Sequence, residues 1–195
     1  MTSLTIRHSF NHPVDNFSPS LSFLELSEQS SQPLDHLPPS LLVLKLNFIP
    51  FSRAEPCWPL DHLPPTNFNM PLDHLPTPLT YLSIGRSFDS PLHHLPPNLR
   101  QLHFSPAGRF NQATDHLPLS LTHLSLPSCF TSSIDNLPPH ITHLKIGMQY
   151  LVNAPNTYLP PALLWLGMRK DGNVNFEFPS DQVPLLPPYL FLFLS

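Results

Sequence analysis

The chain has 195 residues, of which 41% are hydrophobic and 11% are charged, and its formal net charge is −4 at pH 7. The length suits one domain, and the low, slightly acidic charge lacks the basic patches of a nucleic-acid-binding protein. The 28 prolines nearly exclude long helices, because a proline inside a helix removes a hydrogen bond and clashes with the preceding turn.

A short phrase, Asp-His-Leu-Pro, recurs along the chain, and most of its steps are 20 or 22 residues long. A period in this range predicts a solenoid, since each unit is too small to bury its own apolar side and must stack on its neighbours. Eroded copies of the phrase end at Pro161 and Pro188. Full or variant copies begin at Asp15, Asp35, Asp61, Asp73, His93, Asp115 and Asp135.

Each phrase is followed by the pattern Leu-x-x-Leu-x-Leu, whose last three positions alternate in the two-residue period of a strand. We therefore expect one short strand per unit, paired in parallel with the strands of the neighbouring units. Leu102, Leu124 and Leu144 should be equivalent core positions. The predicted strands centre on residues 4–6, 24–26, 44–46, 82–84, 102–104, 124–126, 144–146 and 166–168.

A third pattern, Phe-Asn-x-Pro, occurs at Phe10 and Phe68, with looser copies at Phe88, Phe110 and Phe130. We expect each phenylalanine to stack on its counterpart one coil away. The asparagine can bind backbone groups in a turn, because its short amide side chain reaches them. The aspartate that follows can cap the Leu-Pro-Pro turn by accepting backbone N–H groups.

The combined phrase resembles the FNIP repeat, a relative of the leucine-rich repeat that is named for Phe-Asn-x-Pro, from Met1 to about Met168. The resemblance implies a leucine-rich-repeat-like solenoid. It also implies a source among giant viruses or amoeboid protists, where such repeats often accompany F-box or other signalling modules. We thus expect a single mainly β domain over residues 1–195, with about nine coils of 20–22 residues, one parallel strand per coil, and few or no helices.

Two regions break the repeat. Near residues 47–70, Asp61 and Asp73 are too close together for a full coil, so one strand is expected to be lost. Residues 169–185 contain the turn signal Asp171-Gly172-Asn173. Beyond them, residues 189–194 are apolar and uncharged. They should pair with the strand at 163–168 or join a second copy, because an open strand edge invites pairing.

The cysteines and the ends of the chain bear on the compartment. Cys57 and Cys129 lie four units apart, which at the strand spacing is about 19 Å, whereas a disulfide needs Cα atoms within about 7 Å. Two free thiols favour a reducing compartment. The chain shows neither a signal peptide nor a span of membrane length, so we expect a cytoplasmic protein, or one of the host cytoplasm or virion if it is viral.

The strand positions between the core leucines should point outward and form two columns. They mix aromatic, histidine and isolated charged side chains, as binding hot spots do, although a merely solvated face is the alternative. We expect these to bind a protein partner: Phe23, Val43, Tyr81, Gln101, His123, His143 and Trp165 in the first column, and Glu25, Lys45, His103 and Lys145 in the second.

The sequence gives little indication of a catalytic or metal-binding site. Histidine follows aspartate at His36, His62, His74 and His116, and His94 takes the same position after His93 in the variant copy. A linear ladder of this kind offers a metal ion two neighbours, whereas zinc needs four ligands around one point. Nucleotide-binding and nucleophile motifs are absent. We therefore expect no enzyme, metal or cofactor, and a protein partner rather than nucleic acid or membrane. The alternative is a structural subunit of a virion or filament that self-associates through its C-terminal edge.

Overall fold

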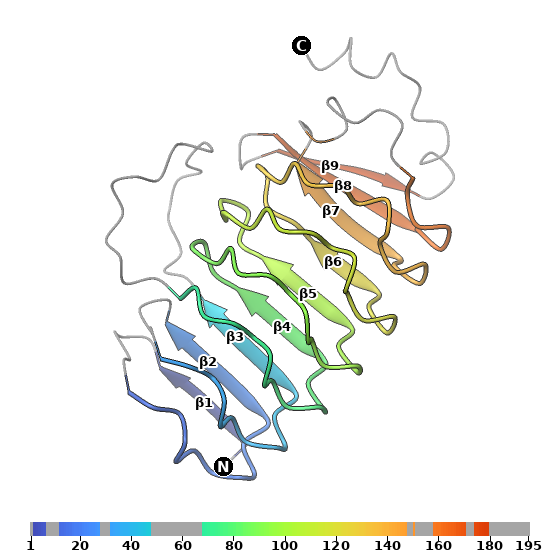
Figure 1. Ribbon diagram of the computed structural model, residues 1–195. Coiled ribbons are helices and arrows are strands. Elements are labelled where there is room, and N and C mark those ends of the chain that lie inside the picture. The colour runs from blue at the N-terminus through green and yellow to red at the C-terminus, as the bar shows by residue number, and fades with distance from the viewer. Residues whose placement is uncertain are drawn as a thin grey trace.

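The computed structural model describes residues 2–6, 12–27, 32–47, 68–147, 150, 158–170 and 174–179. Apart from the helical Tyr150, these residues form strands, turns and extended segments. Nine strands make one sheet in chain order (Figure 1). They are β1 (Ser3–Ile6), β2 (Phe23–Ser27), β3 (Val43–Asn47), β4 (Tyr81–Ile84), β5 (Gln101–Phe104), β6 (His123–Ser125), β7 (His143–Gly147), β8 (Trp165–Lys170) and β9 (Val174–Pro179).

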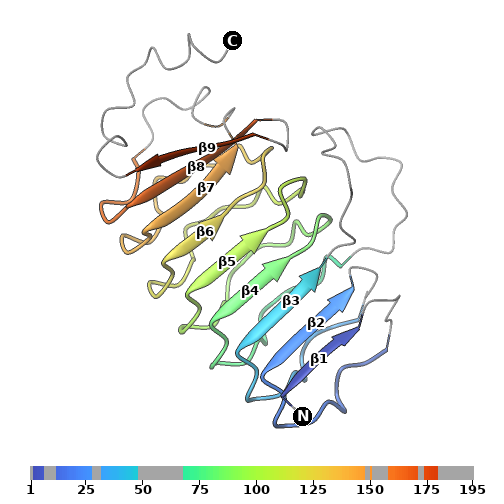
Figure 2. The ribbon, with the colours of Figure 1, turned by 180° about the vertical axis from the view of Figure 1, so that it is seen from behind.

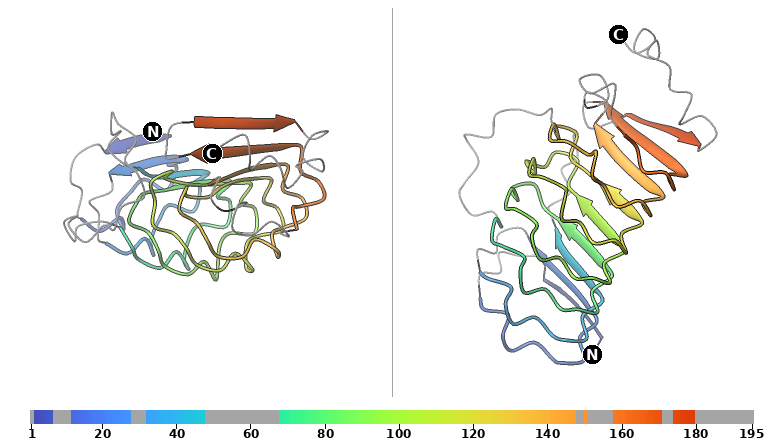
Figure 3. Two further views of the ribbon diagram at one scale, coloured as in Figure 1. Left: turned by 90° about the horizontal axis from the view of Figure 1, so that it is seen from above. Right: turned by 45° about the vertical axis from the view of Figure 1, so that its right-hand side comes forward.

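Strands β1 to β8 are all parallel, and the leucine pattern sets their register. Leu102 of β5 pairs with Leu82 of β4 and Leu124 of β6, and Leu124 pairs with Leu144 of β7. The turns run along one side of the stack and the strands along the other (Figures 2 and 3). This confirms the leucine-rich-repeat-like solenoid. The expected nine coils are slightly too many, because the ninth described strand runs antiparallel and does not begin another coil.

The core consists of columns that run along the stack between the sheet and the turns. The leucines of the Leu-x-x-Leu-x-Leu pattern are buried in the coils of β2 to β8, and Leu102, Leu124 and Leu144 are among them. Behind them lies a ladder of rings, with centroids 6.2 Å apart between Phe68 and Phe88 and 6.1 Å apart between Phe88 and Phe110. It continues from Phe110 to Phe130 at 6.1 Å. The predicted phenylalanine stacking is confirmed.

The Leu-Pro-Pro segment forms a tight turn in each coil. The N–H of Leu41 donates to the carbonyl of Pro38 at 3.1 Å, and the same bond joins Leu99 to Pro96 at 3.1 Å. Proline suits the position after the accepting residue, because its ring fixes φ at the value the turn requires. The prolines therefore end each coil with a turn that returns the chain to the sheet.

Asparagine side chains tie successive coils together. The Oδ1 of Asn111 accepts the backbone N–H groups of Thr131 at 2.8 Å and Ser132 at 3.0 Å. Its Nδ2 donates to Thr131 Oγ1 at 2.9 Å. One asparagine thus satisfies backbone donors of the following coil, which would otherwise need water.

The recurring aspartates also reach the following coil, and this corrects the expectation that they cap their own turns. Asp115 Oδ1 accepts a bond from Asn136 Nδ2 at 3.0 Å, and Asp73 Oδ1 lies 3.3 Å from His94 Nδ1. Asp135 does accept a backbone N–H, but from Tyr158, which also belongs to the next coil. In two coils, the side chain at the second position of the phrase, Asn136 or His94, is therefore a partner for the aspartate of the coil before it.

The sheet is continuous where the repeat is irregular. Strand β3 pairs directly with β4. Thr80 Oγ1 donates to the carbonyl oxygen of Leu42, so the two residues are in contact although they are 38 positions apart in the sequence. Residues 48–67, which include Asp61 and His62, lie outside the described residues. Among the described strands, β3 and β4 are direct neighbours in the sheet.

The C-terminal strand was not predicted. Strand β9 pairs antiparallel with β8, with Gly167 opposite Glu177, and so occupies the edge to which residues 189–194 were expected to add. Pairing of residues 189–194 with the strand at 163–168 was therefore a wrong expectation, because β9 fills that edge, whereas their joining a second copy stays a prediction. Residues 189–194 themselves lie outside the described residues.

The expectation of two free thiols was also wrong. Cys129 is disulfide-bonded, and no cysteine in the described part of the chain is free. The chain's other cysteine, Cys57, lies outside that part. The cysteines therefore give no support for a reducing compartment.

Candidate functional site: the outer face of the sheet

The structure places all the predicted binding residues on the outward side of the sheet. The register puts Phe23, Val43 and Tyr81 in one column, continued by Gln101, His123, His143 and Trp165. The second column holds Glu25, Lys45, His103 and Lys145. All of them are half-buried. We call this surface the outer face.

At its N-terminal end, the outer face carries a small cluster of rings around one lysine. Lys45 Nζ lies 5.3 Å from the ring centroid of Phe23 and 5.9 Å from that of Tyr81, within the range of cation–π attraction. The ring of Tyr81 lies 5.2 Å from that of His103. Burial raises the pKa of Tyr81, and a hydrogen bond with Ser83 partly offsets this rise. The phenol is therefore neutral and can both donate and accept hydrogen bonds.

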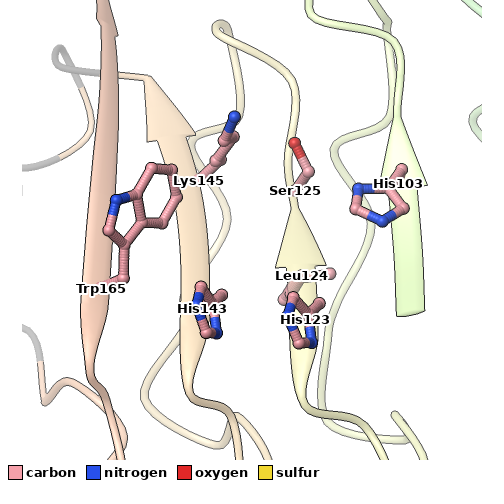
Figure 4. A pocket seen from close by; sticks show the side chains of 7 residues that line it. All are labelled: His103, His123, Leu124, Ser125, His143, Lys145 and Trp165. Carbon is pink, nitrogen blue, oxygen red and sulfur yellow. The ribbon is translucent and has the colours of Figure 1, made fainter. Parts of the chain in front are cut away.

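At the C-terminal end, three rings follow one another across β6, β7 and β8. The imidazoles of His123 and His143 are stacked, with centroids 4.3 Å apart and an angle of 6° between planes. The indole of Trp165 lies 6.0 Å beyond His143. Lys145 Nζ sits 4.9 Å from the indole centroid, so a fixed cation stands beside the rings (Figure 4).

Gly167 makes this arrangement possible. A Cβ atom at this position would lie 2.4 Å from Cη2 and 2.8 Å from Cζ3 of Trp165, and 3.1 Å from Cγ of Lys145. The indole therefore folds over the glycine and packs against the strand. By the two-residue period of the strand Gly167 belongs to the second column, although it was not among the residues expected to bind a partner. The signal was a glycine at the position where the neighbouring coils have Ser125 and Lys145.

These side chains surround a pocket of about 290 Å³. Ser125 is buried and small, so it leaves space between the larger side chains of the neighbouring strands. The lining residues are His103, His123, Leu124, Ser125, His143, Lys145 and Trp165 (Figure 4).

Two threonines determine which nitrogen of the stacked histidines carries hydrogen. Thr122 Oγ1 donates its one hydrogen to the carbonyl of Arg100 at 3.1 Å and lies 2.9 Å from His123 Nδ1. Thr142 Oγ1 likewise donates to the carbonyl of Thr122 at 3.2 Å and lies 2.9 Å from His143 Nδ1. Each Nδ1 must therefore donate its own hydrogen to the threonine. In the neutral rings, Nε2 is left as a hydrogen-bond acceptor.

The charge on the outer face differs from that of the whole chain. Lys45 and Lys145 lie in the second column, and the exposed Arg100 precedes β5. Among the described outward positions from β3 to β8 there is no carboxylate. The exposed aspartates, such as Asp73 and Asp115, lie in the turns. From β3 to β8 the outer face is thus basic on a protein whose net charge is −4, whereas Glu25 of β2 lies opposite Lys45.

The stacked pair predicts a pH-dependent stability. Burial, and then the neighbouring His143, lowers the pKa of His123 below its ordinary value of 6.5. The unfolded chain therefore binds the proton more readily, and this contribution to stability is complete above pH 6.5 and is lost as the pH falls below it. We expect the free energy of unfolding, measured by urea denaturation, to fall less steeply on acidification in His123→Gln than in the wild type. An unchanged pH dependence in this variant would contradict the assignment.

The histidines of the repeated phrase do not converge on a centre. His36, His74, His94 and His116 are all exposed in the turns. In the described ranges, no three histidine, cysteine or carboxylate side chains lie close enough together to hold a metal ion. Nor does the described part of the chain contain a helix long and apolar enough to cross a membrane.

Comparisons with known proteins agree with this architecture. No protein-family model matches the chain, and no curated protein matches it. Among solved structures, the chain is similar to CroV588, described as a novel circular LRR protein, with 27% sequence identity and a TM-score of 0.56. The match covers 86% of this chain but 27% of CroV588. The chain therefore has the fold of a leucine-rich-repeat-like β-solenoid and corresponds to about a quarter of its structural neighbour.

Proposed function

We propose that this chain is a protein-interaction or scaffold module that binds a protein partner through the outer face. The observation that carries the proposal is the half-buried first column from β2 to β8, in which five of the seven side chains are aromatic or histidine rings, flanked by Lys45 and Lys145. Tyrosine, tryptophan and basic residues supply much of the binding energy at protein interfaces. A sheet face this wide can contact an extended or folded partner over several coils.

The distribution of variable residues also favours this face. The core columns repeat leucine in coil after coil, and the turns repeat proline and aspartate, since both serve the stack itself. The outward columns change from Tyr81 to Gln101 to His123 along the same row. A binding surface requires such position-specific chemistry, whereas the stacking of coils does not.

The finer classification belongs to the same proposal. The recurring phrase favours an FNIP-repeat protein, and the likeness to CroV588, from the giant virus CroV, favours a giant-virus or amoeboid source. We propose a binding rather than a catalytic role, because the hydroxyls beside His123 and His143 donate their hydrogens to backbone carbonyls and not to the imidazoles. In a viral setting the partner would be a protein of the host cytoplasm or of the virion.

Trp165→Ala tests the proposed surface. We expect it to weaken binding to a partner captured from the native cell by about 2 kcal/mol or more, because the indole is a large, packed contact beside Lys145. The dissociation constant can be measured by isothermal titration calorimetry, with circular dichroism to show that the fold is intact. Tyr158→Ala, which removes an aromatic side chain that is 80% exposed away from the sheet, is the control and should have little effect.

Two outcomes would count against the proposal. A partner insensitive to replacement of Phe23, Tyr81, His123, His143 and Trp165 would bind elsewhere. Growth of the particle mass with concentration in size-exclusion chromatography would instead favour the alternative of an assembly subunit.

A further inference from the structure

We propose that the pocket between β5 and β8 receives a carboxylate side chain of an acidic segment of the partner, and that the stacked pair His123 and His143 takes up a proton when it binds. This inference rests on the proposed function, since it names the chemistry of the partner at the same face. It is carried by charge, by the shape of the pocket and by the hydrogen bonding of the two histidines.

Charge complementarity selects an acidic partner. Lys145 lines the pocket, Arg100 lies beside the start of β5, and the described outward positions from β3 to β8 contain no carboxylate that could neutralise them. On the outer face, Glu25 belongs to β2, five strands from β7. The basic side chains near the pocket therefore favour a partner segment that carries carboxylates.

The shape of the pocket suits a side chain rather than a large ligand. Its volume is about 290 Å³, and four rings make up most of its lining. Such walls can contact the methylene groups of a glutamate, while Lys145 pairs with the carboxylate. The ammonium group is held over the indole of Trp165, so its position is set before the ligand arrives, and less side-chain freedom is lost on binding.

The two histidines link this contact to protonation. In the neutral rings both Nδ1–H groups are used by Thr122 and Thr142, and each Nε2 is an acceptor, which cannot bond to a carboxylate. Protonation converts Nε2 into a donor. Two charged imidazoles stacked 4.3 Å apart repel each other, and Lys145 adds to this repulsion. A bound carboxylate offsets that repulsion, so proton uptake and binding favour each other.

The test uses the complete chain and two capped synthetic peptides, Glu-Leu-Glu-Leu-Glu and its counterpart with glutamine in place of every glutamate. Five extended residues span about 17 Å, slightly more than the roughly 14 Å across the three strand spacings from β5 to β8. Binding is followed by isotope-edited NMR of the histidine and indole nitrogens. We expect the glutamate peptide to shift the signals of His123, His143 and Trp165, and the glutamine peptide to leave them unchanged.

The pH dependence carries the sharper expectation. Affinity for the glutamate peptide should rise about fivefold or more between about pH 7.5 and about pH 5.5, the range in which histidine titrates while glutamate stays ionised. Calorimetry in two buffers of different ionisation enthalpy should show proton uptake. The double variant His123→Gln with His143→Gln should lose this dependence, and Lys145→Gln should weaken binding at both pH values. The control His94→Gln, at an exposed histidine in a turn, should behave as the wild type does.

Several outcomes would overturn the inference. These are equal binding of the two peptides, binding of neither, a pH-independent affinity, or an effect of His94→Gln equal to that of the double variant. Tighter, pH-independent binding of a phosphoserine peptide would assign the pocket to a phosphorylated partner instead. If the native partner responds to Trp165→Ala but not to Lys145→Gln or to pH, the proposed function stands and this inference fails. If the glutamate peptide binds at the pocket but the native partner is insensitive to substitutions across the outer face, this inference stands and the proposed function fails.

Discussion

Replacing Phe110 with alanine is expected to lower the free energy of unfolding by about 3–5 kcal/mol. The side chain is 1% exposed, and its ring lies 4.1 Å from that of Phe104 and 6.1 Å from each of Phe88 and Phe130. The substitution removes a link from the ladder of rings and leaves a cavity that three neighbouring coils share. Because each coil contacts only its neighbours, few other side chains can move to fill this cavity.

The measurement is equilibrium denaturation in urea, followed by circular dichroism. Leu119→Ala is the control, because this leucine is 71% exposed and its loss should change stability by less than about 0.5 kcal/mol. Similar losses in the two variants would show that Phe110 does not lie in the core.

Leu124→Ala is expected to cost about 2–5 kcal/mol through the cavity it leaves. Leu124 is 2% exposed and lies between Leu102 and Leu144 in the column that connects β5, β6 and β7. It also lines the floor of the pocket on the outer face, so the substitution should loosen the support of His123 and His143 as well.

Leu164→Ala is the matched comparison, because this leucine lies directly before β8 but is 56% exposed. Urea denaturation should separate the two variants clearly. A cost for Leu124→Ala no greater than that for Leu164→Ala would contradict the register in which Leu102, Leu124 and Leu144 are equivalent.

Most of the stack could be predicted from the sequence because one physical constraint is repeated in every coil. The alternation around Leu102 and Leu124 determines which side of the strand is buried, and a shift by one residue would expose the leucines. The same alternation placed Tyr81, His123 and Trp165 on the outer face. The two-residue period of the strands is therefore enough to assign each residue to the core or to the outer face.

Strand β9 was missed because it does not carry the repeated phrase. Residues 174–178 alternate apolar and polar positions, Val-Asn-Phe-Glu-Phe, and follow the turn signal Asp171-Gly172-Asn173, which is the signature of a hairpin. Residues 189–194 were expected at this edge instead, because they are apolar and uncharged. Hairpin formation needs only local pairing, and it ended the parallel order of the sheet.

The details of the site depend on contacts between coils, which no single repeat encodes. The fold of the Trp165 indole over Gly167 depends on a missing side chain in its own strand. The orientation of His123 depends on Thr122, whose hydroxyl is directed by the carbonyl of Arg100 one coil away. Sequence position identified the participants, but only the stacked structure shows how they hold one another.

The direct pairing of β3 with β4 has a practical consequence for protein engineering. Strand β3 ends at Asn47 and β4 begins at Tyr81, and the two strands pair in register, so the outer face passes from one to the other without a break (Figure 2). The closure entropy of a connecting segment rises slowly with its length. The sequence between β3 and β4 is therefore a suitable place to insert a fluorescent label or an affinity tag, which would leave the outer face intact.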